Sequence, residues 1–147
     1  MTVGLIAAVI AGILIAVQTT LVGALGARMS PFVAAVWVHF GGLVFGVIGV
    51  LVSRIGFQVG PLRQAPWGLL AGVAGMLLVT SIAVAVGGAG LATTLAVVTG
   101  VQMLMGFAIE WSGLVGRAMA LDPARLAGAG LIVVGVYLIA SRTPVPA

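Results

Sequence analysis

Three side chains in this chain of 147 residues carry a carboxylate or an imidazole, the groups that most often move protons or hold metal ions. They are His39, Glu110 and Asp122, and the chain contains no cysteine. Catalytic and metal sites need several such groups gathered at one place. We therefore expect neither an enzyme nor a protein that depends on a metal ion or another cofactor.

Glu110 is the most informative of the three, because it ends a long apolar stretch that begins near Leu91. An acid inside a membrane-spanning stretch is costly and marks a functional site by default. A carboxylate at the carboxyl end of a helix is also unfavourable, so we expect an arginine partner such as Arg117 or a helix that continues past Gly113. Thr99 lies eleven residues earlier, close to the same helical face, so both side chains could face one groove. A paired structural acid and a proton or cation site are the two open interpretations.

Two amides and one imidazole lie within other apolar stretches. An amide in hydrocarbon must find a hydrogen-bond partner or line water, so Gln18 and Gln102 serve either helix-to-helix hydrogen bonds or substrate binding. An imidazole can take up a proton near neutral pH, and His39 is either such a group or a packing residue. Thr80 and Ser81 are expected to donate to backbone carbonyls one turn earlier. The candidate substrate- or proton-binding residues are Gln18, His39, Thr99, Gln102 and Glu110.

The composition requires a lipid environment around these polar groups. Apolar residues make up 63% of the chain and charged residues 5%, whereas soluble domains carry about 25% charged residues. The mean hydropathy of +1.38 also excludes disorder. The net charge of +4 comes from six scattered arginines, and without a basic patch we expect no nucleic-acid partner.

Five apolar runs are long enough to cross a bilayer, which takes about 20 residues in a helix. Gly87, Gly88 and Gly90 predict a short turn, after which Thr93 or Thr94 could cap the next helix. Residues 54–65 are expected to form a loop, and the first run is too long for a cleavable signal. The sequence predicts an all-α polytopic membrane protein, a bundle of five transmembrane helices in a single domain over 1–147. The expected helices cover about residues 3–26, 32–53, 66–86, 91–111 and 124–140.

Small residues recur every fourth position along three of these runs. Helices associate in membranes by close packing, which small side chains permit. We expect these stripes to pack the bundle, and the alternative is that some are sliding or dimer surfaces. The predicted packing residues are Gly4, Ala8, Gly12, Ala16, Gly42, Gly46, Gly72 and Gly75.

The arginines are distributed unevenly between the two sides of the membrane. Four of them fall on one side and two, Arg28 and Arg142, on the other. The positive-inside rule then favours a cytoplasmic amino terminus. A difference of two residues also suits a chain that inserts both ways or pairs with an oppositely oriented partner.

Several motifs together resemble the five-helix, YdcZ-like branch of the drug/metabolite transporter superfamily over nearly the whole chain. The strongest is the eight-residue spacing from Gln102 to Glu110, followed by an aromatic residue and Gly-Leu. The other matches are Gln18 with Leu25, Pro66 and Trp67 before Gly72 and Gly75, and Arg125, Leu126 and Gly128.

The chain departs from this family pattern at three positions. Val22 replaces an Asn, His39 replaces a Ser, and Glu110 replaces an Asp. The resemblance implies a half-sized transporter in the bacterial inner membrane that works as an antiparallel homodimer or with a paired sibling chain. Alternating access to the two sides of the membrane would then come from rocking of the dimer around a central cavity lined by the first four helices.

The leading functional hypothesis is therefore a secondary transporter or exporter of a small metabolite or lipophilic compound. Proton coupling is expected through Glu110 or His39, with Gln18 and Gln102 as hydrogen-bond partners of the substrate. Its partners would be the lipid bilayer, a small-molecule substrate and a second chain. A non-transporting membrane scaffold or accessory subunit is the alternative, and a dimeric channel is a third possibility.

Overall fold

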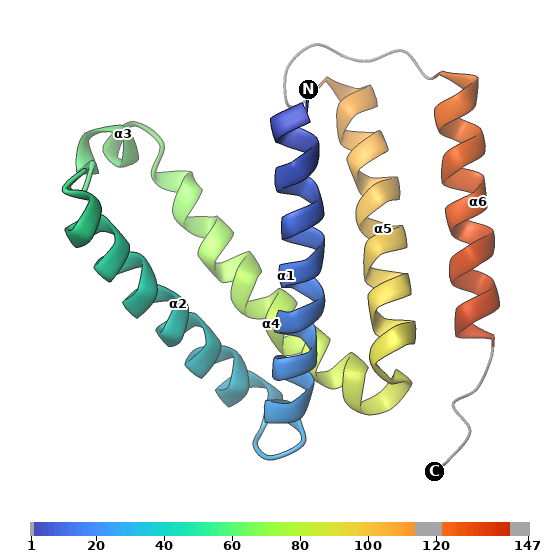
Figure 1. Cartoon of the computed structure of the whole chain (residues 1–147), viewed down its shortest axis with the longest axis horizontal. Helices are drawn as coiled ribbons and strands as arrows, with labels where there is room; N and C mark the ends of the chain where they lie inside the picture. The colour runs from blue at the N-terminus through green and yellow to red at the C-terminus, as the bar shows by residue number, and fades with distance from the viewer. Residues whose placement is uncertain (1, 114–121, 142–147) are drawn as a thin grey trace. The chain divides into compact units, whose positions relative to one another are not determined.

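The computed structural model describes residues 2–113 and 122–141, and nearly all of them are helical (Figure 1). Five helices are long and apolar enough to cross a membrane, and no strand occurs among the described residues. The protein is thus all-α and polytopic, as predicted. The five spanning helices are α1 (Thr2–Gly26), α2 (Pro31–Ser53), α4 (Leu70–Ala89), α5 (Leu91–Ser112) and α6 (Pro123–Ala140).

A short helix, α3 (Val59–Gln64), lies within the loop that we expected over residues 54–65. The third expected span begins at Pro66 as the 3₁₀-helix η1 (Pro66–Leu69), which leads directly into α4. Pro61 does not prevent α3 because it lies in the first turn, where a backbone N–H has no intrahelical partner. The expectation of an irregular loop over 54–65 was wrong for this part.

The predicted turn around Gly87 and Gly88 was also wrong in its extent. Both glycines lie within α4, and Gly90 alone separates α4 from α5, with a φ of 79°. Glycine adopts such a positive φ without steric cost. Neither threonine caps α5, because the Thr94 hydroxyl instead donates to the carbonyl of Gly90 at 2.8 Å.

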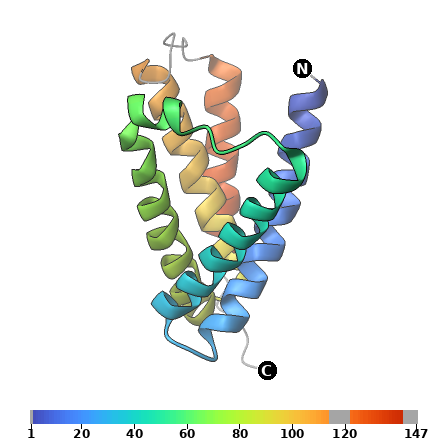
Figure 2. The ribbon, with the colours of Figure 1, turned by 90° about the vertical axis from the view of Figure 1, so that its left-hand side faces the viewer.

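The helices form two compact units, residues 1–88 and 89–147. In the first unit, α1, α2 and α4 meet near the turn between α1 and α2 and spread apart toward the α3 end (Figures 1 and 2). The Ser30 side chain caps α2 by accepting a hydrogen bond from the N–H of Val33 at 3.4 Å. Pro31 occupies the first helical turn, as its fixed φ favours.

A small apolar cluster holds the first unit together where its helices meet. It contains one residue of α1, one of α2 and three of α4, namely Val22, Ala35, Val79, Ile82 and Ala83. Gly23 allows α1 and α4 to approach closely, because a Cβ there would overlap the side chain of Val86. A Cβ on Gly26 would likewise stand 3.0 Å from the Cβ of Ala83.

Most of the predicted small-residue stripe lies away from this cluster. Gly75 packs against His39, but a Cβ built on five other glycines of these stripes meets no described atom within 4 Å beyond the backbone of its own helix. Ala8 is exposed and Ala16 is half-buried. Packing of these positions against a second chain stays a prediction. The five glycines are Gly4, Gly12, Gly42, Gly46 and Gly72.

The second unit is a hairpin of α5 and α6. Asp122 caps α6 by accepting a hydrogen bond from the N–H of Ala124 at 3.1 Å, and Pro123 begins the helix. Gly113 ends α5 with a φ of 72°. The two helices pack closely at Gly100, where a Cβ would stand 2.7 Å from Cγ2 of Val136.

Candidate functional site

The five predicted site residues are divided between the two units. Gln18 and His39 belong to residues 1–88, and Thr99, Gln102 and Glu110 belong to residues 89–147. Both glutamines lie on exposed helix surfaces, and neither amide makes a hydrogen bond to a described residue. The glutamines therefore differ from the other three residues. His39 makes a hydrogen bond, Thr99 lines a groove and Glu110 forms an ion pair.

Glu110 forms an ion pair with Arg125, which lies in the first turn of α6. The Oε2 atom of Glu110 is 3.3 Å from Nη1 of Arg125. Since α5 ends at Ser112, the expectation of a helix that continues past Gly113 was wrong. An arginine partner was the other expectation, and the arginine in place is Arg125, whereas Arg117 lies outside the described residues.

The strength of this ion pair is limited by its exposure. The side chains of Arg125 and Glu110 are 44% and 50% exposed. Pairs this accessible contribute about 0.2–1 kcal/mol in water. The arginine also offsets the unfavourable position of a carboxylate at the end of a helix.

Thr99 lines a shallow groove of about 470 Å³ between α5 and α6. Its hydroxyl is the one polar side-chain group in the lining, and Glu110 is not among the lining residues. Eleven residues of helix separate the two by about 16 Å. The groove is otherwise formed by Ala92, Leu95, Ala96, Gly100, Ile132, Gly135, Val136 and Ile139.

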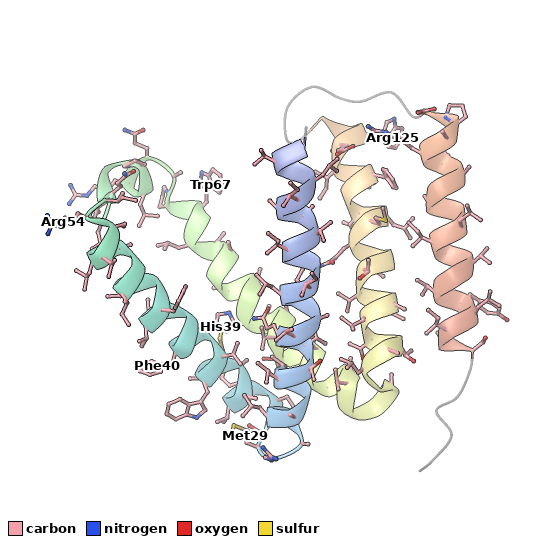
Figure 3. All side chains as sticks on the ribbon, in the orientation of Figure 1. Met29, His39, Phe40, Arg54, Trp67 and Arg125 are labelled. Atoms are coloured by element: carbon pink, nitrogen blue, oxygen red, sulfur yellow. The ribbon has the colours of Figure 1, made fainter. Side chains whose placement is uncertain are left out.

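His39 lies half-buried on α2 and points toward α4 (Figure 3). Its Nδ1 is 2.9 Å from the carbonyl oxygen of Ala35. A carbonyl can only accept, so this contact assigns the proton to Nδ1 and leaves Nε2 as the acceptor of the neutral ring. Nε2 faces Gly75, where a Cβ would stand 3.0 Å away. The ring thus packs between the two helices, with Nε2 against α4 at Gly75.

Thr19 is a polar residue that the sequence analysis missed. It is 2% exposed, yet its hydroxyl makes no hydrogen bond to any described residue. The hydroxyls of Thr20, Thr80 and Ser81 instead donate to carbonyls four residues earlier, at 2.8–2.9 Å. For Thr80 and Ser81 this confirms the expected backbone hydrogen bonds.

The position of Thr19 on α1 explains its burial. It precedes Gly23 by four residues and Gly26 by seven, so it lies on the face of α1 that meets α4. This spacing was visible in the sequence. The amide of Gln18 drew attention instead because an amide is the more polar group.

The described residues offer no cluster of ligands for a metal ion. No group of three or more His, Asp or Glu side chains lies together within residues 2–113 and 122–141. The buried and half-buried polar side chains of the described residues carry hydroxyls and one imidazole. Such groups form hydrogen bonds and move protons.

A comparison with known protein families found one match that spans nearly the whole chain. Residues 3–138 match the family described as "Putative inner membrane exporter, YdcZ". The matched region begins in α1 and ends in α6, so it includes all five spanning helices. Comparisons with curated proteins and with solved structures returned no match.

Proposed function

This chain belongs to the YdcZ-like branch of the drug/metabolite transporter superfamily, and we propose that it is a secondary transporter that exports a small metabolite. It is a multi-pass membrane protein, and the family's description assigns its members to the inner membrane. The observation that carries the proposal is the half-buried imidazole of His39, with Nε2 facing α4 and no hydrogen bond from it to a described residue.

Proton coupling is assigned to His39 rather than to Glu110. An imidazole exchanges protons near neutral pH, and its position on the α2 face toward α4 lets protonation change a contact between helices. Glu110 is held by Arg125 at the end of α5. A carboxylate in such a pair serves to place two helix ends, which supports the structural interpretation of this acid.

The transporter is proposed to act as an antiparallel dimer of identical or sibling chains. Transporter sites commonly lie between two repeats of opposite orientation, and this chain supplies one set of five helices. Open glycines on α1 and α2, such as Gly4, Gly12 and Gly46, leave room for a second chain to approach. The weak arginine bias is compatible with insertion in both orientations.

Transport in sealed proteoliposomes tests the function. A pH gradient should drive substrate accumulation, and collapsing the gradient should abolish it. His39→Gln should lower the rate at least tenfold, whereas Glu110→Gln should retain most of it. Candidate substrates are screened as mixtures of small metabolites, and the accumulated compound is identified by mass spectrometry.

A non-transporting scaffold or accessory subunit is the second candidate. The hydroxyls of Thr20, Thr80 and Ser81 bond to their own helices, and Glu110 is paired, as a purely structural protein would require. If no metabolite accumulates with or without a gradient, and His39→Gln leaves assembly of the chain unchanged, this candidate replaces the transporter.

A further inference from the structure

The connection between α2 and α4 combines basic and large apolar side chains. Arg54 directly follows α2, and Arg63 lies in the last turn of α3. Five large apolar side chains of the same stretch are exposed, and residues 54–67 that carry them are named the connecting segment. The five are Ile55, Phe57, Val59, Leu62 and Trp67.

The lengths of the flanking spans place the connecting segment at the membrane surface. The spans on either side of it, Pro31–Ser53 and Pro66–Ala89, contain 23 and 24 residues. Helices of this length are about 35 Å long, whereas the hydrocarbon core is about 30 Å thick. Figure 3 shows Arg54 and Trp67 at the end of the first unit where these two spans are joined. Both side chains therefore lie at the level of the lipid headgroups, on the same side of the membrane.

The positive charges of this segment have no acidic partner in the first unit. Residues 1–88 contain no Asp or Glu. The side chains of Arg54 and Arg63 are exposed, and neither forms an ion pair or a hydrogen bond with a described residue. The two acids of the chain are engaged elsewhere, since Glu110 pairs with Arg125 and Asp122 caps α6. Two guanidinium groups thus remain to be neutralised by an anion from the surroundings.

The apolar side chains favour a lipid over a dissolved anion as that partner. An anion in solution is recognised through charge and hydrogen bonds, and it would leave Phe57 and Trp67 in contact with water. The boundary of a bilayer offers phosphates beside the upper part of the acyl chains. Tryptophan is enriched at this level of membrane proteins, and the fork of a guanidinium group matches the oxygens of a phosphate.

We infer that the connecting segment binds the headgroups of anionic phospholipids. Arg54 and Arg63 each donate hydrogen bonds to a lipid phosphate, and the apolar side chains between them insert among the upper acyl chains. Each arginine acts on its own lipid, so no fixed distance between the two is required. An anionic surface favours a nearby arginine about fivefold over a neutral surface. The inference concerns lipid binding and does not depend on the transport of a substrate.

Trp67 is a direct reporter, because it lies within the segment. It is one of three tryptophans, and Trp37→Phe with Trp111→Phe leaves it as the sole one. The full chain is placed in vesicles of equal parts phosphatidylglycerol and phosphatidylcholine, with bromine on the acyl chains of one lipid or the other. Bromine quenches the fluorescence of a tryptophan that it contacts. The two degrees of quenching should correspond to a preference for phosphatidylglycerol of at least about threefold.

Arginine variants in this background test the charges. Arg54→Gln and Arg63→Gln should each lower the preference, and the double variant should remove it. Arg28→Gln is the matched control, because Arg28 lies in the turn between α1 and α2, at the opposite end of α2. It should leave the preference unchanged. Equal quenching of all variants in vesicles of brominated phosphatidylcholine alone shows that Trp67 keeps its place in the bilayer.

Three results would overturn the inference. The first is equal quenching of Trp67 by the two brominated lipids. The second is no quenching by either, which would show that protein, such as an acidic surface of a second chain, covers the segment. The third is an unchanged preference in the double variant. The first two need no arginine variant, so they decide the matter even if the double variant fails to fold.

Discussion

Gly100 of α5 lies so close to Val136 of α6 that a Cβ at position 100 would stand 2.7 Å from Cγ2 of the valine. Real Cβ atoms do not approach this closely, and a γ-methyl of a β-branched side chain has little freedom to move away. The contact makes the absence of a side chain at position 100 a condition for the observed distance between the two helices.

Gly100→Ala should destabilise the α5–α6 hairpin by about 1–3 kcal/mol, the usual effect of overpacking. The measurement is the free energy of unfolding in mixed micelles under denaturant. Gly106→Ala is the matched control on the same helix, because no described atom lies within 4 Å of its Cβ position. The double variant Gly100→Ala, Val136→Ala should recover part of the loss. An equal effect of both alanine substitutions would contradict the role of this contact.

Gly75→Ala should alter the environment of His39, since the new Cβ would take the place 3.0 Å from Nε2. We expect a changed imidazole resonance and loss of proton-driven transport. Gly72→Ala lies one turn away on α4 with open space around it, and it should leave both unchanged. Proton-driven transport at the wild-type rate in Gly75→Ala would contradict the role of this contact.

Glu110→Gln should lower stability by at most about 1 kcal/mol, because the pair with Arg125 is half-exposed. Transport and its dependence on the pH gradient should persist. The check is the transport rate across a series of gradients, with His39→Gln measured in parallel. If Glu110→Gln abolished coupling while the protein stayed folded, the carboxylate would be a proton site after all.

Labelling from one side of the membrane tests the antiparallel arrangement. The chain has no cysteine, so single cysteines can be placed at Ala27, between α1 and α2, and at Gln58, after α2. Dual insertion predicts that an impermeant maleimide labels about half of each variant from outside intact cells. Complete labelling of one position and none of the other would exclude a homodimer of opposed chains.

Local signals in the sequence predicted most helix ends. Proline fixes a φ suited to the first turn, which placed the starts of α2 and α6 within a residue of Pro31 and Pro123. Two other signals were misread. Pro61 was assigned to a loop although it lies in the first turn of α3, and Gly87 and Gly88 were assigned to a turn although α4 continues through them. A glycine or proline tolerates a break without requiring one.

Predictions that depend on contacts between helices were harder. Arg125 is fifteen residues from Glu110 and reaches it because α6 folds back beside α5. The burial of Thr19 likewise became evident only from the packing of α1 against α4. Residue types in the sequence identified His39 and Glu110, but the settings that separate their roles come from tertiary structure.

Hydroxyl groups on the spanning helices bond to their own backbone at Thr20, Ser53, Thr80 and Ser81. A hydropathy scale counts each of these residues as polar, although its hydrogen-bonding capacity toward the surroundings is largely satisfied within the helix. For the cellular machinery that inserts nascent helices into the bilayer, the effective hydrophobicity of these segments is therefore higher than their composition implies. Alanine at any of the four positions should leave insertion efficiency almost unaltered.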